Sequence, residues 1–325
     1  MCILPEKIRS KQRTALLGSV ALLLLLTAFQ LGLYISGYDF GAELYFPGHL
    51  PTVTAVVWIA VTVGAVLLSL PLPGKISCYE LKIPSTLSGD YASLLIVPMM
   101  AISLYLTFAT PNSGDGLKSL LASTDPADQT ARTMLQLTLM AAVASAVFAF
   151  IQFQTRKVTP LFATSALLWC GFSALRIYFD MRYLLMSPRR VLHLIALIAL
   201  LVFFVGELRL ARGIATHRFY TITATIAMIL AGTDALTNII LTIIGYIAPG
   251  SELATYFILL TVAIYCFVRL SVLASDRAAS GENKKTADKD SPDESPDESP
   301  DDSPETVAPL EDSNTSPDTA EEAPQ

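Results

Sequence analysis

Long apolar runs, separated by short polar segments, recur along most of the chain. A run of about 20 apolar residues is long enough to cross the roughly 30 Å hydrocarbon core of a bilayer as a helix. The pattern therefore predicts an all-α, polytopic transmembrane bundle of about eight spans. The predicted spans cover approximately residues 14–36, 51–70, 91–110, 133–154, 159–179, 190–210, 219–246 and 252–274. Hydrophobic residues make up 53% of the 325, and the mean hydropathy of +0.53 agrees with this class.

The two ends of the chain differ from this pattern. Basic residues within 1–13 precede the first apolar run, as they do in a secretory signal. That run, Ala15 to Ile35, is longer than a typical signal core, and no A-x-A-like cleavage site follows it. We therefore interpret it as a retained first span that follows a basic cytoplasmic N-terminus.

The last segment, 275–325, is rich in Pro, Ser, Asp and Glu and contains the repeat S-P-D-E. Such a composition cannot bury enough apolar surface to offset the entropy lost on ordering, which predicts a disordered acidic tail. Four serines that precede proline are candidate phosphorylation sites, and the tail could contact a basic cytoplasmic protein. The alternative is a tail that only solubilises and repels its own charges. The four serines are Ser291, Ser295, Ser299 and Ser303.

Charge divides along the same boundary and predicts an orientation. The net charge of -6 combines +5 over residues 1–276 with -11 over residues 277–325. With the N-terminus inside, the inner segments hold 13 Lys and Arg residues and the outer loops hold 5. The positive-inside rule then places both termini in the cytoplasm, and we expect the spans to cross a cell membrane. The loop between the fifth and sixth predicted spans does not fit this orientation, because it places three arginines outside.

Asp234, near the middle of the seventh predicted span, is the first candidate for chemistry. A charge in hydrocarbon costs roughly 2.5–3.5 kcal/mol on insertion scales, so it normally faces a partner or a water-filled cavity. Asn238 lies one turn further along the same helix face, and Glu207 and Arg209 lie near the inner end of the sixth span. These four residues form a candidate intramembrane polar site. Asp234 could be a proton- or cation-responsive carboxylate, or a polar contact that holds helices together.

Glu207 and Arg209 are two residues apart and so do not face each other on a helix. The partner of Glu207 is left open, as a residue on another helix. His193 is isolated in the sequence and is interpreted as a hydrogen-bonded residue of a helix interface, with a proton shuttle as the alternative.

A second candidate is a cluster of charges around the end of the fifth span. Arg176 and Asp180 are four residues apart, so they share a helix face and can pair. Together with Arg182, Arg189 and Arg190 they could bind an anion or a lipid head group. The alternative is that these residues are interfacial anchors.

The same region carries a resemblance. The pattern R-x-Y-F-D-M, then S-P, then a span ending in E-x-R, over residues of about 172–218, resembles an uncharacterised group of polytopic bacterial inner-membrane proteins. The resemblance implies a membrane location and no particular activity.

The sequence contains no recognisable catalytic, metal-binding or phosphate-binding motif. The four cysteines are spread singly, which predicts neither a disulfide framework nor a zinc site. Phosphate-binding loops and the H-E-x-x-H and G-x-S-x-G patterns do not occur. We therefore predict no catalytic residue, no metal, no cofactor and no nucleic-acid partner, with the lipid bilayer as the main environment.

Two functional hypotheses follow, and the oligomeric state is left open. The first is a non-enzymatic multi-pass membrane protein that senses, regulates or scaffolds. The alternative is a small-solute or ion transporter that uses Asp234 as a coupling carboxylate. A third possibility, an intramembrane enzyme that acts on lipid, would require Asp180, Glu207 or Asp234 to converge on one cavity.

Overall fold

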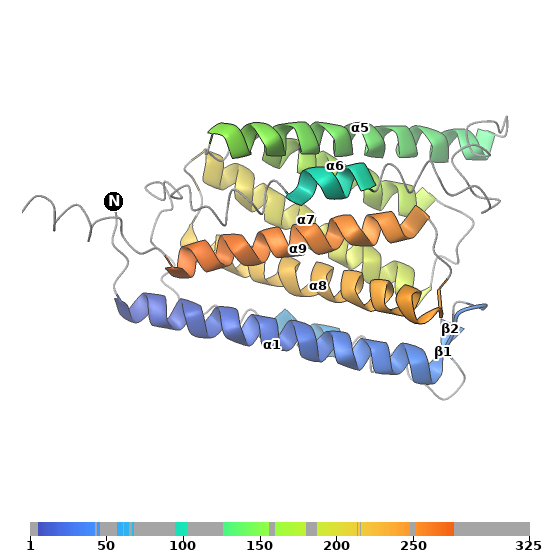
Figure 1. The fold of residues 1–325 in the computed structure, drawn as a ribbon, viewed down its shortest axis with the longest axis horizontal. Helices are drawn as coiled ribbons and strands as arrows, with labels where there is room; N and C mark the ends of the chain where they lie inside the picture. Colours follow the sequence, from blue (N-terminus) through green and yellow to red (C-terminus); the bar gives the residue numbers. More distant parts are fainter. Residues whose placement is uncertain are drawn as a thin grey trace, which may run out of the picture. The chain divides into compact units, whose positions relative to one another are not determined.

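Six long helices dominate the computed structural model (Figure 1). Each is long and apolar enough to cross a membrane, so the chain is a multi-pass α-helical membrane protein. The helices are α1 (Glu6–Gly37), α5 (Pro126–Thr155), α6 (Pro160–Phe179), α7 (Pro188–Ala211), α8 (His217–Ile244) and α9 (Ser251–Ser275). The structure describes residues 6–42, 44–45, 57–60, 62–64, 67, 95–102, 126–155, 160–179, 187–212, 214, 216–247 and 251–275.

These six helices lie at six of the predicted spans, with ends that mostly agree to within two residues. The clearest differences are at the starts of α1 and α5, which begin about two turns before the predicted spans. Pro126 opens α5, and proline is tolerated in the first turn of a helix because the amide it lacks has no partner there. The segment between the predicted spans 91–110 and 133–154 is therefore helical from residue 126 onward.

The predicted count of spans, their orientation and the acidic tail stay predictions. Most of the predicted spans 51–70 and 91–110 lies outside the described residues, although residues 57–60, 62–64, 67 and 95–102 are helical. The count of eight spans and the orientation are therefore not tested. Residues 276–325, with the four candidate serines, also lie outside the described part of the chain.

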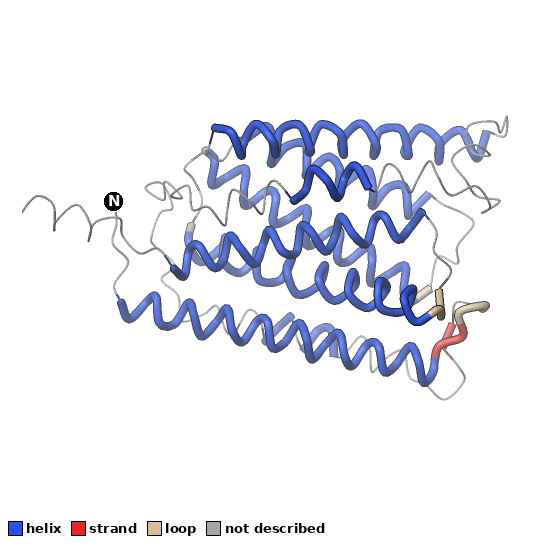
Figure 2. The backbone as a smooth tube through the Cα atoms, viewed as in Figure 1, coloured by secondary structure: helices blue, strands red, loops and turns tan. Residues whose placement is uncertain are grey.

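A short hairpin follows α1, in a segment predicted as a loop (Figure 2). Its strands β1 (Tyr38–Asp39) and β2 (Leu44–Tyr45) pair antiparallel. The turn is held by Asp39, whose Oδ1 accepts hydrogen bonds from the backbone amides of Gly41 at 2.8 Å and Ala42 at 3.2 Å. Phe40, from the same turn, lies 5.6 Å from the Tyr246 ring just beyond α8. The hairpin thus follows the end of α1 directly and packs against the residues just beyond the end of α8.

The α8 helix stops at a specific backbone signal. Gly245 has a φ of 92°, which is in the left-handed region that glycine adopts without penalty. The backbone amide of Tyr246 then donates to Leu241 O at 2.9 Å, as in a Schellman cap.

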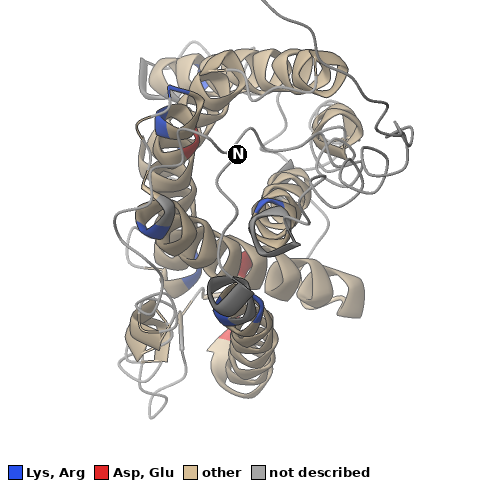
Figure 3. Ribbon diagram, turned by 90° about the vertical axis from the view of Figure 1, so that its left-hand side faces the viewer, with Lys and Arg blue, Asp and Glu red and all other residues tan. Residues whose placement is uncertain are grey.

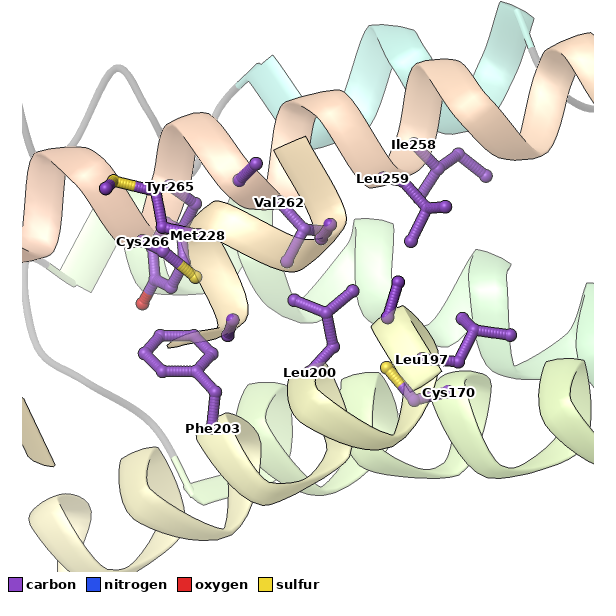
Figure 4. Packing of buried hydrophobic residues seen from close by; sticks show 14 of the residues in the cluster. Cys170, Leu197, Leu200, Phe203, Met228, Ile258, Leu259, Val262, Tyr265 and Cys266 are labelled. Carbon is purple, nitrogen blue, oxygen red and sulfur yellow. The ribbon is translucent and has the colours of Figure 1, made fainter. Parts of the chain in front are cut away.

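Helix α8 lies at the centre of the described helices. Consecutive helices from α5 to α9 pack against each other in chain order, and α1 packs against both α8 and α9. As a result, 72% of the α8 span is buried, against 22% for α1. Apolar side chains of α7, α8 and α9, including Leu200, Phe203, Met228 and Val262, meet in one layer (Figure 4). Polar residues on α8 can therefore face protein instead of lipid, which is the cheaper environment for them.

Gly232 of α8 lies where α1, α8 and α9 meet, and it generates a prediction. A Cβ atom at this glycine would lie 2.6 Å from Leu23 Cδ1 and 3.6 Å from Ala263 Cβ. We expect Gly232→Leu to lower the stability by about 1–3 kcal/mol, because overpacking forces neighbours to move. The midpoint of thermal unfolding in lipid nanodiscs measures this. Gly32→Leu is the control, since a Cβ at Gly32 meets nothing within 4 Å. Equal midpoints for the two variants would contradict the packing described here.

Candidate functional site

Helices α7, α8 and α9 are joined by two networks of buried polar side chains. The first, the Asp234 network, consists of Arg189 and His193 from α7, Asp234 and Asn238 from α8, and Tyr256 from α9. Charged residues are sparse on the described helices (Figure 3), so the few that are buried stand out.

Both carboxylate oxygens of Asp234 contact other side chains. Oδ2 lies 2.5 Å from His193 Nδ1, and Oδ1 accepts a hydrogen bond of 3.0 Å from Asn238 Nδ2. The same amide nitrogen of Asn238 also donates to the backbone oxygen of Asp234 at 2.8 Å. Asp234 and Asn238 are both fully buried. The carboxylate is therefore fixed in one orientation by two neighbours on two helices.

Arg189 extends this network towards α9. Its Nε donates to Asn238 Oδ1 at 2.7 Å, and its Nη2 donates to the Tyr256 hydroxyl at 3.1 Å. The Tyr256 ring also lies beneath the guanidinium, 5.6 Å away, and edge-on to the His193 ring at 5.3 Å. Asn238 thus links a guanidinium to a carboxylate, so positive and negative charge are buried together.

The second network, the Glu207 network, lies further along α7. Arg269 of α9 binds Glu207 with both ends of its fork, Nε to Oε1 at 3.0 Å and Nη2 to Oε2 at 2.9 Å. Tyr220 of α8 donates its hydroxyl to the same Oε1. The Tyr265 ring lies 5.7 Å from the guanidinium, and its hydroxyl accepts a bond of 3.4 Å from Gln152 of α5. A planar, two-bond pair of this kind is the strongest arrangement for a carboxylate and an arginine.

The two networks lie at different depths of the same helices. His193 and Glu207 are separated by about 21 Å along α7, at 1.5 Å per residue. Between them lies the apolar layer that contains Leu200, Phe203 and Met228 (Figure 4). The three helices are thus tied together twice, with apolar packing in between.

The structure divides the predicted intramembrane polar site. Asp234 and Asn238 do lie together, but Glu207 belongs to the other network. Arg209 contacts neither carboxylate; its guanidinium lies over the Phe219 ring at 5.2 Å. This agrees with the expectation that residues two apart on a helix point in different directions.

The structure also divides the predicted anion or lipid head-group cluster. Arg189 lies inside the Asp234 network, whereas Arg190 donates from Nη2 to the backbone oxygens of Ile177 and of Tyr178, the latter at 3.1 Å. These are carbonyls of the last turn of α6, which lack partners within the helix. Arg190 therefore ties the end of α6 to the start of α7. Three residues of the cluster remain: Arg176 lies in the last turn of α6, while Asp180 and Arg182 lie outside the described residues.

Several residues of these networks were not singled out from the sequence. Arg269 is the largest omission, although a lone arginine inside an apolar span requires an acidic partner, and Glu207 was also left without one. His193 was predicted at an interface, which fits its position, but its partner was not identified. Tyr220, Tyr256 and Tyr265 give no separate signal, because tyrosine is common in apolar spans.

The networks contain carboxylates, an imidazole and arginines, yet they do not form a metal centre. Among the described residues, no three His, Cys, Asp or Glu side chains gather closely enough to hold a metal ion. The fold and the networks define a polytopic helical membrane protein whose buried charges are paired between helices. No protein-family model, curated protein or solved structure is similar enough to the chain to name a family for it.

The bidentate pair generates a second prediction. We expect Arg269→Met to destabilise the protein by about 3–5 kcal/mol, because it leaves the Glu207 carboxylate buried and unpaired. The double variant Glu207→Leu with Arg269→Met should recover most of that loss, since an apolar pair of similar volume needs no partner. Thermal unfolding in one lipid composition compares them. Arg209→Met is the matched control and should change the midpoint little; a loss as large as that of Arg269→Met would contradict the assignment.

Proposed function

We propose that this chain is a non-enzymatic membrane protein that senses, regulates or scaffolds, with a packed helical core and an acidic cytoplasmic tail as its contact. The observation that carries the proposal is that other side chains engage both oxygens of Asp234. His193 of α7 contacts Oδ2, while Asn238 of α8 itself binds Oδ1 and is held by Arg189 of α7. Glu207 supports it in the same way, since Arg269 takes both of its oxygens. Charges held like this act as links between helices.

A transport pathway requires different surroundings for a coupling carboxylate. Such a group must exchange its proton or ion with water on each side of the membrane in turn. Here the partners of Asp234 are protein atoms, and the apolar layer around Leu200 lies between the two polar networks. This arrangement favours a closed core over a conduit.

The core can be tested by the accessibility of Leu200, which is fully buried in that layer. We expect Leu200→Cys, in a background without the four native cysteines, to resist a membrane-impermeant thiol reagent applied from either side. Ile214→Cys is the positive control, because Ile214 is 60% exposed and lies between the spans of α7 and α8. It should react from one side only. Labelling of Leu200→Cys from both sides would contradict the closed core and favour the transporter.

The transporter remains the second candidate because of one contact. A carboxylate and an imidazole 2.5 Å apart can share and exchange a proton, and 8% of the His193 side chain remains exposed. In that case Asp234→Asn would abolish solute-driven proton flux in proteoliposomes while leaving abundance nearly unchanged. The proposed scaffold or sensor predicts the reverse, a lower abundance with no flux to lose.

The tail supplies the proposed contact with a basic cytoplasmic partner. Removal of residues 277–325 deletes 15 Asp and Glu against 4 Lys and Arg. We expect this truncation to abolish co-purification of a partner while the membrane core keeps its thermal midpoint. Replacing the acidic residues of 291–306 by Asn and Gln should have the same effect, whereas Ser→Ala changes at the four serines test the role of phosphate. Unchanged co-purification without the tail would refute the tail as the contact.

A further inference from the structure

Several buried side-chain oxygens have no hydrogen-bond partner among the described residues, and three of them lie on α8 and on the part of α1 beyond Leu23. They are Gln30 Oε1, Thr233 Oγ1 and Thr237 Oγ1, and all three residues are fully buried. A buried polar atom without a partner costs about as much free energy as a lost hydrogen bond. We call these three atoms the α1–α8 oxygen site.

Thr233 and Thr237 differ from other threonines of α1, α8 and α9. Thr27 of α1, Thr242 of α8 and Thr261 of α9 each donate their hydroxyl to the carbonyl oxygen four residues earlier, at 2.8 Å. This is the usual way for a helical threonine to satisfy its hydroxyl in an apolar environment. Thr233 and Thr237 do not use it, so their hydroxyls are available to a ligand.

Contacts at two levels place α1 along one side of α8. A Cβ atom at Gly232 would lie 2.6 Å from Leu23 Cδ1, and further along both helices Leu241 packs in one cluster with Tyr34. From the first contact to the second, α1 advances by 11 residues and α8 by 9. The two helices therefore run in the same direction through this region.

Helix geometry puts the three oxygens on this side of α8 and on the facing side of α1, because Asp234 and Asn238, at about 200° and 240° around α8 from Gly232, occupy the side that faces α7. At 3.6 residues per turn, Leu241 lies about 180° around α8 from Gly232, and Thr233 and Thr237 lie between them at about 100° and 140°. Gln30 lies two turns beyond Leu23 on the same face of α1. Its amide nitrogen donates to the Tyr34 hydroxyl at 3.3 Å, which leaves the amide oxygen available.

We propose that the α1–α8 oxygen site binds a water molecule. A buried water typically makes about three hydrogen bonds, which is the number of atoms available here. A water molecule can accept hydrogen bonds from the two threonine hydroxyls and donate one to the Gln30 amide oxygen, so all three atoms gain a hydrogen bond. The threonines are one turn apart, with Cβ atoms about 5–6 Å from each other, a separation that a single water can bridge.

A monovalent cation fits these atoms less well. It would use only oxygen lone pairs and would leave both hydroxyl protons to find acceptors elsewhere. The nearest negative charge along α8, Asp234, is already paired with His193 and linked through Asn238 to Arg189. A cation would therefore gain no uncompensated negative charge in exchange for its lost hydration.

The bound water makes the contact between α1 and α8 different from those among α7, α8 and α9. Those helices are tied by direct side-chain bonds, whereas α1 would hold to α8 partly through an exchangeable molecule. This inference goes beyond the proposed function and does not depend on it.

The site is tested by removing its hydroxyls with little change in shape. We expect Thr233→Val and Thr237→Val each to lower the thermal midpoint by about 2–4 °C, the shift produced by losing one net hydrogen bond in a protein of this size. Thr237→Ser, which keeps the hydroxyl, should stay near the wild-type midpoint. Thr261→Val is the control for removing a hydroxyl bonded only within its own helix. A rise in midpoint for the two valine variants would show unsatisfied hydroxyls with no ligand, and would overturn the proposal.

Two further measurements on the full chain separate the remaining outcomes. Thr237→Val combined with Gln30→Leu should lose less than the sum of the single losses, because both contact one molecule; strictly additive losses would overturn a shared site. The midpoint should also be the same in NaCl and in choline chloride at equal ionic strength. A sodium-dependent rise that disappears in Thr233→Val would overturn water in favour of a cation.

Discussion

The pairing of Glu207 with Arg269 is the constraint on which the packing of α7, α8 and α9 depends. Each of these charges alone would be costly inside a membrane, and together they are tolerated only when geometry lets both ends of the guanidinium reach the carboxylate. That geometry requires α7 and α9 to keep one register and one rotation. The Tyr220 hydroxyl adds α8 to the same point, because it uses a lone pair that Arg269 leaves available. A shift by one residue along any of the three helices would break the set.

The Asp234 network repeats this requirement at a second depth. Two polar contacts, far apart along the same helices, determine both the relative height and the relative rotation of those helices. Apolar packing between them has little such specificity, since lipid tails and leucine side chains are equally apolar. The polar residues thus select one arrangement among the many that the apolar surfaces alone would accept.

The helices could be predicted well from the sequence, whereas the site could be predicted only in part. Apolar runs signal spans because length and hydropathy act locally, and Pro160, Pro188 and Gly245 mark helix ends through backbone geometry. Asp234 was found because a charge in an apolar run is conspicuous. Its partner His193 was not found, since pairing depends on which helices are neighbours and on their rotation. Arg269 and Glu207 illustrate the same limit, because two lone charges in different spans do not by themselves show that they meet.

Arg190 has a consequence for how the chain is connected. It holds the last carbonyls of α6 from the start of α7, so these two helices are joined by a side chain as well as by residues 180–187. The covalent connection at this corner is then partly redundant. Separately expressed halves, ending and beginning within this corner, have a built-in means of finding each other in the bilayer.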